Sequence, residues 1–271
     1  MLDKLNLDGL EFYINLTEAS LFENKLSNIL SLKYLINLTY MNLAQNLITN
    51  IEPIGVLNKL EVLYLSSNKI QSVLNNLINL KHLFLANNRI KQFELTEKLV
   101  KLRLLDLSQN RLTFIDKIEN FTSLRYLRLT SNKIRTINSI KNLSNLREID
   151  LSYNSLRQLK FVDCLDRLEE LIVTKNLLSQ IDFDDYLPKL ETLDLSHNAI
   201  IDVKQINGSL KQLKKLYLSN NFIKELDFND KLLNLISFYA NKNQIVTING
   251  LEIAENLETV ELESNKITSI Y

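Results

Sequence analysis

Twelve asparagines recur along this chain at steps of 22 residues, apart from single steps of 20 and 23. Repetition at a fixed period of this length indicates a repeat array, in which one unit cannot bury its apolar face alone and must stack on its neighbours. The spacing therefore predicts a solenoid of twelve repeats. The repeated residues are Asn24, Asn46, Asn68, Asn88, Asn110, Asn132, Asn154, Asn176, Asn198, Asn221, Asn243 and Asn265.

Apolar residues keep fixed distances from each of these asparagines. The residue eight positions before is always Leu, the residues five and three before are apolar, and the residue two after is always Leu or Ile. Because the residues five and three before are two apart, they share one face of a short strand, while the residue between them points the other way. Each repeat is therefore predicted to add one strand to a parallel sheet that is buried on one side.

The asparagine itself follows the strand, where the chain must turn. A buried Asn amide has both donor and acceptor atoms, so it can satisfy backbone groups that the turn leaves unpaired. Stacked repeats are thus expected to form an asparagine ladder. The return limb has only about ten residues, so short 3₁₀ or extended segments are expected there rather than full helices.

Segments such as LEVLYLSSNKI, LRYLRLTSNKI, LETLDLSHNAI and LKKLYLSNNFI resemble leucine-rich repeats of the form LxxLxLxxNxI, across nearly the whole chain. The resemblance implies an α/β solenoid, a horseshoe with a concave parallel sheet of about 12 strands and short 3₁₀ or extended convex segments. Residues 1–15 are predicted to be a degenerate N-terminal cap, and residues 16–271 the repeat domain, with no clear C-terminal cap.

Charge and composition narrow the range of partners and locations. Lys plus Arg and Asp plus Glu number 32 each, so no overall field favours nucleic acid or an anionic membrane. No apolar run approaches the roughly 18 residues of a membrane helix, and the first residues lack the pattern of a signal peptide. The one cysteine, Cys164, fits a reducing compartment and is expected to be a small buried residue. A cytoplasmic protein without membrane insertion is predicted.

Motifs for catalysis and for metal binding are missing from the sequence. Four glycines form no GxGxxG or phosphate loop, and no GxSxG elbow occurs. The only imidazoles, His82 and His197, lie in different repeats from each other and from Cys164, without metal-ligand spacing. The chain is therefore predicted to be no enzyme and to hold no metal or cofactor.

The exposed face of the sheet is the remaining candidate site, and the residues four and six before each asparagine are expected to occupy it. Neighbouring strands lie about 4.8 Å apart, so side chains from successive repeats should merge into patches, and aromatic patches are typical of protein interfaces. A protein partner with an apolar or aromatic ridge flanked by basic residues would complement this face. The predicted partner-binding residues are an apolar and aromatic patch (Tyr40, Val62, Tyr64, His82, Phe84, Leu104 and Tyr126), an acidic stretch (Asp106, Glu148, Asp150, Glu170 and Asp194) and a second aromatic pair (Tyr217 and Tyr239).

Among leucine-rich repeats, the unit of about 22 residues resembles the class that contains the leucine-rich regulatory subunit of protein phosphatase 1 and bacterial internalins. Residues 115–129, IDKIENFTSLRYLRL, are similar to that regulatory subunit. The resemblance implies an intracellular scaffold that binds a phosphatase catalytic subunit on its concave face.

Two other interpretations stay open. Residues 182–200, DFDDYLPKLETLDLSHNAI, resemble secreted or cell-surface recognition proteins of the insect immune and adhesion type, which implies an extracellular fragment. The chain ends at Tyr271, one residue after an apolar position of the last repeat, so the end is expected to be truncated, capped by a partner or covered by another copy of the chain.

Overall fold

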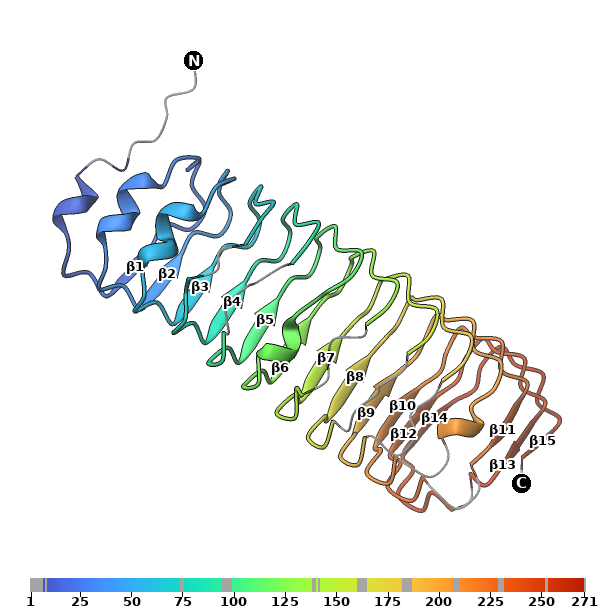
Figure 1. The fold of residues 1–271 in the computed structure, drawn as a ribbon. Helices are drawn as coiled ribbons and strands as arrows, with labels where there is room; N and C mark the ends of the chain where they lie inside the picture. Colours follow the sequence, from blue (N-terminus) through green and yellow to red (C-terminus); the bar gives the residue numbers. More distant parts are fainter. Residues whose placement is uncertain are drawn as a thin grey trace. The chain divides into compact units, whose positions relative to one another are not determined.

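The computed structural model describes residue 7 and residues 9–73, 76–93, 99–137, 140, 142–159, 165–181, 187–206, 210–228, 232–251 and 253–270. The chain forms two compact units, residues 1–132 (unit 1) and residues 133–271 (unit 2). In each unit, successive coils of the chain each contribute one short strand to a parallel sheet (Figure 1). Cys164 lies outside the described residues.

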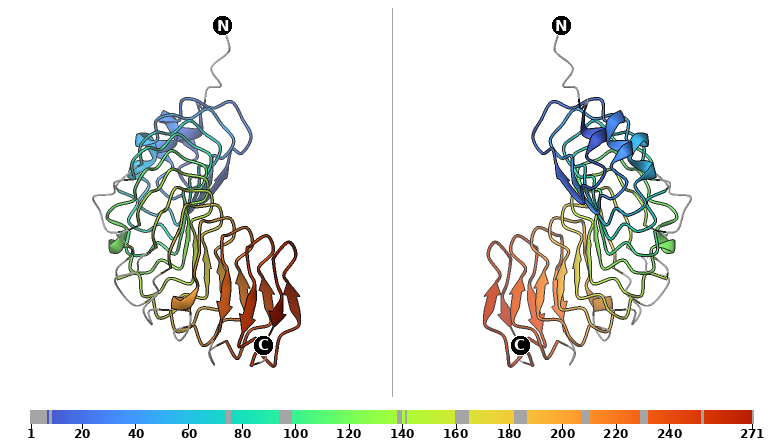
Figure 2. Two further views of the ribbon diagram at one scale, coloured as in Figure 1. Left: turned by 90° about the vertical axis from the view of Figure 1, so that its right-hand side faces the viewer. Right: turned by 90° about the vertical axis from the view of Figure 1, so that its left-hand side faces the viewer.

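Unit 1 holds a parallel sheet whose strands pair in sequence order, β1 to β6. Its 3₁₀ helices η1, η2 and η3 lie on the side of the coils opposite the strands, as the blue segments of Figure 2 show. Short 3₁₀ turns on the return limb confirm what the limb length predicts. The elements are η1 (Leu10–Phe12), β1 (Glu18–Ser20), η2 (Leu30–Tyr34), β2 (Tyr40–Asn42), η3 (Glu52–Val56), β3 (Val62–Tyr64), β4 (His82–Phe84), β5 (Leu104–Asp106), η4 (Ile118–Asn120) and β6 (Tyr126–Arg128).

Unit 2 continues the same plan with six strands in the order β7, β8, β9, β10, β12 and β14. Together the two units contribute the twelve repeat strands that the asparagine spacing predicts. The elements are β7 (Glu148–Asp150), β8 (Glu170–Ile172), β9 (Thr192–Asp194), η5 (Lys204–Ile206), β10 (Lys215–Tyr217), β11 (Glu225–Asp227), β12 (Ser237–Tyr239), β13 (Thr247–Asn249), β14 (Thr259–Glu261) and β15 (Ser269–Ile270).

A second, three-stranded parallel sheet in unit 2 was not expected from the sequence. Strands β11, β13 and β15 pair in that order on the segments that follow the asparagine turns. The backbone N–H of Val246 donates to Lys224 at 2.9 Å, and the N–H of Thr268 donates to Val246 at 3.0 Å. Extended segments in consecutive coils lie in register here, and β-branched residues such as Thr247 and Ile248 favour pairing.

The alternation of burial along each strand follows the sequence pattern. In β2 to β6 the central residue is buried and the two flanking residues are half-buried. Leu and Ile make up most of the buried apolar residues of each unit, and Leu35, Leu57, Leu99 and Phe121 on the return limb of unit 1 are buried as well. This burial confirms the predicted repeat solenoid with one buried and one exposed sheet face.

The asparagines form the predicted ladder. Oδ1 of Asn110 accepts the backbone N–H of Ile90 in the preceding repeat at 3.0 Å. Its Nδ2 donates to the carbonyls of Leu85 and Leu107, at 2.9 and 3.0 Å. Each amide thus bonds buried backbone groups of two repeats at once. Equivalent bonds recur at Asn46, Asn68, Asn88 and Asn132 of unit 1 and at Asn176, Asn198, Asn221 and Asn243 of unit 2.

The residue before each ladder asparagine adopts a left-handed backbone conformation, with φ between 53° and 59°. None of these residues is glycine, although this conformation disfavours residues that carry a Cβ. Hydrogen bonds across the repeats hold the turn: the N–H of Gln45 donates to Ser66, and the N–H of Ser67 donates to Ala86, both at 2.8 Å. The hydrogen bonds of the surrounding repeats therefore stabilise a left-handed backbone conformation that most residues with a Cβ disfavour.

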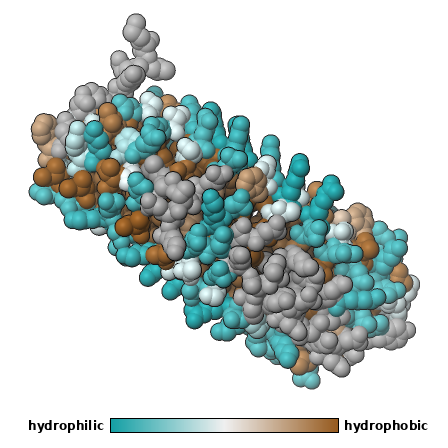
Figure 3. Space-filling view, in the orientation of Figure 1, coloured by the Kyte–Doolittle hydropathy of each residue, from teal (hydrophilic) through white to brown (hydrophobic). Residues whose placement is uncertain are grey.

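The domain boundaries remain predictions. Of the proposed cap, residues 1–15, the structure describes residue 7 and residues 9–15, which include η1. Hydrophobic residues gather at this end of unit 1 in Figure 3. Phe12, Tyr13 and Ile14 of the proposed cap are exposed.

Replacing Asn110 with alanine should lower the free energy of unfolding by about 2 kcal/mol, because the N–H of Ile90 is left buried without its partner. The carbonyls of Leu85 and Leu107 each lose one of two amide donors and keep those of Asn88 and Asn132. Urea unfolding followed by circular dichroism measures the loss. The matched control is Asn79→Ala, which removes an exposed amide that donates to the carbonyl of Asn58. Equal losses in the two variants would contradict a special role for the ladder.

Candidate functional site

The predicted aromatic patch (Tyr40, Val62, Tyr64, His82, Phe84, Leu104 and Tyr126) lies on the exposed sheet face of unit 1. The strand register places one row of the patch, Tyr40, Val62, His82, Leu104 and Tyr126, along the first residues of β2 to β6. Tyr64 and Phe84 stand in the second row, between Asn42 and Asp106. All seven side chains are half-buried. The structure therefore brings the whole predicted patch together.

The rings of the patch are in direct contact. Tyr64 and Phe84 stack with centroids 4.3 Å apart and an angle of 2° between their planes. Tyr40 lies 5.8 Å from Tyr64 at a tilt of 54°. Because β3 and β4 hold the two residues as neighbours in register, the backbone brings their rings into stacking contact. A rigid, half-exposed aromatic surface of this kind can receive an apolar side chain with little loss of its own conformational freedom.

Sequence reasoning missed a further row on this face, the residues seven before each asparagine. Lys81, Arg103 and Arg125, here called the basic row, directly precede β4, β5 and β6. Their backbone N–H groups extend the strand ladder, since Lys81 donates to Glu61 and Arg103 donates to Lys81, both at 2.7 Å, and Arg125 donates to Arg103 at 2.8 Å. The signal was available in the sequence, because this position lies next to the first exposed strand residue and is polar in these repeats.

The charges of this row influence His82 in the middle of the patch. Burial lowers the pKa of His82 below its usual 6.5, and the positive charges of Arg103 and Lys81 lower it further, while Glu61 opposes them. Glu61 forms an ion pair with Lys81 at 2.7 Å, and its hydrogen bond to that lysine lowers the pKa of the carboxyl group. At neutral pH the imidazole is therefore uncharged.

The predicted acidic stretch is divided between the units. Asp106 lies in unit 1, whereas Glu148, Asp150, Glu170 and Asp194 lie on strands β7, β8 and β9 of unit 2. The three aspartates have a local role: Oδ1 accepts the backbone N–H two residues on, at Ser108, Ser152 and Ser196 respectively, over 2.8 to 2.9 Å. These carboxylates stabilise the turn after each strand. Their presence at this position therefore has a structural explanation as well as the predicted functional one.

The second predicted aromatic pair also forms. Tyr217 of β10 and Tyr239 of β12 stack with centroids 4.8 Å apart and planes at 3°. Burial raises the pKa of the Tyr217 phenol, and Tyr239, Asp194 and Glu170 raise it further. Both rings belong to the exposed sheet face of unit 2 and are half-buried.

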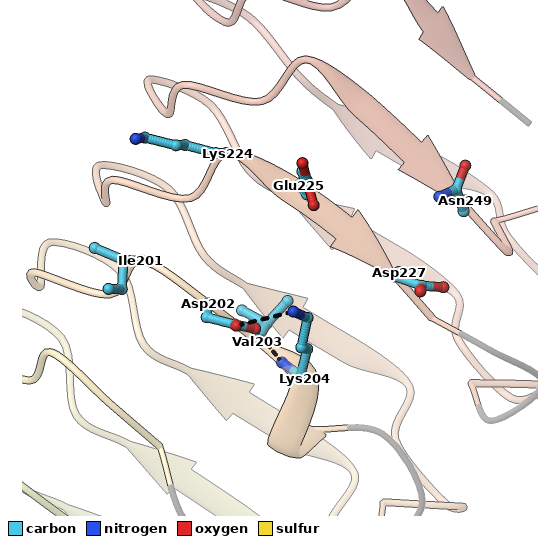
Figure 4. Close-up of a pocket in the computed structure, with 8 residues that line it drawn as sticks. All are labelled: Ile201, Asp202, Val203, Lys204, Lys224, Glu225, Asp227 and Asn249. Carbon is cyan, nitrogen blue, oxygen red and sulfur yellow. Dashed lines mark hydrogen bonds and ion pairs between the residues drawn. The ribbon is translucent and has the colours of Figure 1, made fainter.

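A polar hollow of about 270 Å³ lies elsewhere in unit 2, beside the second sheet (Figure 4). Glu225 and Asp227 project from β11 next to Asn249 of β13, and Asp202 accepts the backbone N–H of Lys204 at 2.8 Å. The Lys204 ammonium lies 3.5 Å from the same carboxylate. This hollow combines charges of both signs with the apolar residues Ile201 and Val203, and its lining includes no aromatic residue, so the aromatic patch is the better candidate for protein recognition.

Neither a metal site nor a membrane span is found in the described part of the chain. No group of three or more His, Cys, Asp or Glu side chains there could hold a metal ion. Its helices are 3₁₀ turns of three to five residues, and none has the length and apolar character needed to cross a bilayer.

The titration of His82 predicts a pH-dependent stability. Because the folded pKa lies below the unfolded one, the unfolded chain takes up the proton first as the pH falls. The contribution of His82 to the free energy of unfolding is therefore fully present above about pH 6.5 and is lost as the pH falls through the folded pKa. His82→Gln should remove this component, so its urea midpoint should fall less between pH 7.5 and pH 5 than that of the native chain. Parallel curves for the two proteins would contradict the shift.

Comparison with known proteins supports the fold at the level of sequence. The family model described as "Leucine Rich repeats (2 copies)" matches residues 58–97 and 188–231, and the model "Leucine rich repeat" matches residues 100–156, together about half of the chain. A search of curated protein sequences gives no match.

Several solved structures are similar over most of their length. A leucine-rich repeat protein of Leptospira interrogans is 31% identical, with a TM-score of 0.75, and the match covers 96% of this chain and 75% of that one. An internalin of Listeria monocytogenes, InlF, is 28% identical with a TM-score of 0.72, covering 96% and 84%. A chain from an octameric complex of Latrophilin 3, Unc5D and the leucine-rich repeats of FLRT2 is 25% identical with a TM-score of 0.75, covering 86% and 77%.

Domains of this kind generally serve as scaffolds for protein–protein interaction and are typically non-catalytic. With its ladder asparagines, its stacked strands and these matches, the chain belongs to the leucine-rich repeat proteins.

Proposed function

We propose that this chain is a non-catalytic scaffold that binds a protein partner on its exposed sheet face, with the aromatic patch of unit 1 as the centre of contact. The observation that carries the proposal is the parallel, stacked Tyr64–Phe84 ring pair, half-buried and held side by side on two adjacent strands. Aromatic side chains in such positions are frequent hot spots of protein interfaces. The FLRT2-containing complex gives a precedent for a similar leucine-rich repeat domain assembled with other proteins.

The partner-binding surface of unit 2 is proposed to be the Tyr217–Tyr239 pair together with Glu148, Asp150, Glu170 and Asp194. The hydrogen bonds of Asp150 and Asp194 use one carboxylate oxygen each for the turn and leave the second oxygen for other donors. Nucleic acid is not the proposed ligand, because the positive and negative side chains of the chain are equal in number.

A phosphatase catalytic subunit is the finer proposal for the partner, and it rests on the similarity of residues 115–129 to the phosphatase 1 regulatory subunit. This proposal also places the chain in the cytoplasm. Co-purification of a phosphatase with the chain from the source cell tests it, and a partner set without any phosphatase would reject it.

The second candidate is a domain of a secreted or cell-surface recognition protein. The similarity to InlF and to a chain of the FLRT2-containing complex favours this candidate. Fractionation of the source cell distinguishes the two, since a scaffold for a cytoplasmic phosphatase should be found in the cytosol. Self-association through the last repeat, where Val260 and Ile270 are exposed, remains a further proposal that a concentration-dependent mass in solution would support.

Tyr64→Ala and Phe84→Ala should each weaken partner binding by about 2 kcal/mol, close to 30-fold in Kd, because each removes half of the stacked pair. Titration calorimetry with the captured partner measures the change. The fold should remain intact, since both side chains lie on the face that the core does not use.

Two further variants make this test specific. Tyr34→Ala removes an exposed tyrosine from η2 of unit 1, away from the sheet face, and should leave the affinity unchanged. Tyr217→Ala reports whether the ring pair of unit 2 takes part. Full affinity after loss of both Tyr64 and Phe84 would overturn the proposed site.

A further inference from the structure

The positively charged side chains beside the aromatic patch differ in whether they form an ion pair. Lys81 is neutralised by its ion pair with Glu61, so one cation of the basic row already has a partner. Arg103 and Arg125 are exposed, and neither side chain forms a hydrogen bond or ion pair with another residue in the described part of unit 1. Two adjacent guanidinium groups are therefore available on this face.

One acidic residue, Asp106, lies within β4, β5 and β6, and it pairs in register with Arg128 of β6. Asp106 is the strand residue that pairs in register with Phe84, and its Oδ1 accepts the backbone N–H of Ser108 at 2.9 Å. Arg103 and Lys81 also lower the pKa of His82, because their positive charges disfavour a proton on the imidazole in addition to the effect of burial. Within these three strands and the residues that directly precede them, the positive side chains of Lys81, Arg103, Arg125 and Arg128 outnumber the negative one of Asp106.

We propose that unit 1 recognises an acidic segment of a partner protein, whose carboxylates bind Arg103 and Arg125 while an apolar side chain covers the Tyr64–Phe84 ring pair. The inference rests on the proposed function and adds the chemistry of its partner. The planar guanidinium group donates two parallel hydrogen bonds to a carboxylate, which makes arginine well suited to this contact. For unit 1, a partner with acidic side chains beside its apolar residue therefore replaces the partner with basic flanks that the sequence predicts.

The geometry sets the spacing of the segment. Arg103 and Arg125 precede neighbouring strands, so their Cα atoms are separated by about 4.8 Å, and the ring pair lies on β3 and β4, one strand further along. A partner segment that crosses the strands can therefore place its apolar side chain on the rings and acidic side chains within a few residues of it.

Selection from a random library of 12-residue peptides displayed on phage tests the inference on the whole chain. Enriched peptides should combine an aromatic or large apolar residue with two or more Asp or Glu residues within a few positions. Enrichment of neutral or basic peptides would overturn the acidic partner. A single-stranded oligonucleotide of equal charge that bound more tightly than the selected peptides would also overturn it.

Charge reversal then locates the contact. The double variant Arg103→Glu, Arg125→Glu should weaken binding of the selected peptides at least tenfold, and added salt should reduce the affinity of the native chain. The matched control is Arg89→Glu, Arg111→Glu, which makes the same change in net charge at two exposed arginines that directly follow ladder asparagines. This control should stay within about threefold of the native chain, because Arg89 and Arg111 follow the asparagine turns, whereas Arg103 and Arg125 precede the strands. Equal losses in the two double variants would reduce the effect to overall charge and reject the assignment.

The failure of this inference is distinguishable from failure of the proposed function. If the selected peptides lose affinity on Tyr64→Ala and Phe84→Ala but not on reversal of the two arginines, the site stands and the acidic partner is wrong. If neither set of variants weakens binding, or if no peptide is enriched, both are overturned. Circular dichroism and urea unfolding of every variant establish that the losses do not come from unfolding.

Discussion

The structure depends on one recurring hydrogen-bonded arrangement, the side-chain amide of an asparagine buried between two repeats. A chain that reverses direction after every three-residue strand leaves backbone N–H and C=O groups inside the molecule, where each unpaired group destabilises the fold. Asn110 illustrates the solution, because one amide bonds the N–H of Ile90 and the carbonyls of Leu85 and Leu107. The same bonds link each repeat to the one before it, so the ladder joins local turns into a stack.

The stack determines how surface chemistry is assembled. Residues that are 20 or 22 apart in the sequence, such as Val62, His82 and Leu104, become neighbours across adjacent strands. The exposed face is therefore composed of rows, and each row has its own character. In unit 1 an aromatic row lies beside a basic one, whereas the strands of unit 2 carry acidic residues and a tyrosine pair. The residues of the core and ladder and the residues of the exposed face thus occupy different positions of the same repeat.

Most of the fold and part of the site follow from the sequence. The fixed offsets around Asn68 or Asn110 predict strand, turn and core, because burial and ladder bonding leave few choices at those positions. The position of Tyr64 beside Phe84 follows from the same register. The second sheet of unit 2 does not, since pairing of β11, β13 and β15 depends on how closely successive return limbs stack. The alternation of exposed residues within the strands does not predict a role for Arg103 and Arg125 either, because these two residues directly precede the strands.

The left-handed residue before each ladder asparagine has a consequence for how such a molecule can be modified. Its backbone is held by bonds from the neighbouring repeats, while side chains as different as those of Glu23, Tyr153 and Lys175 all occupy the position. The three are also exposed, so a reactive group placed there would point into solvent without entering the core. The turn thus offers attachment points for probes in several repeats, at the exposed residues of this position.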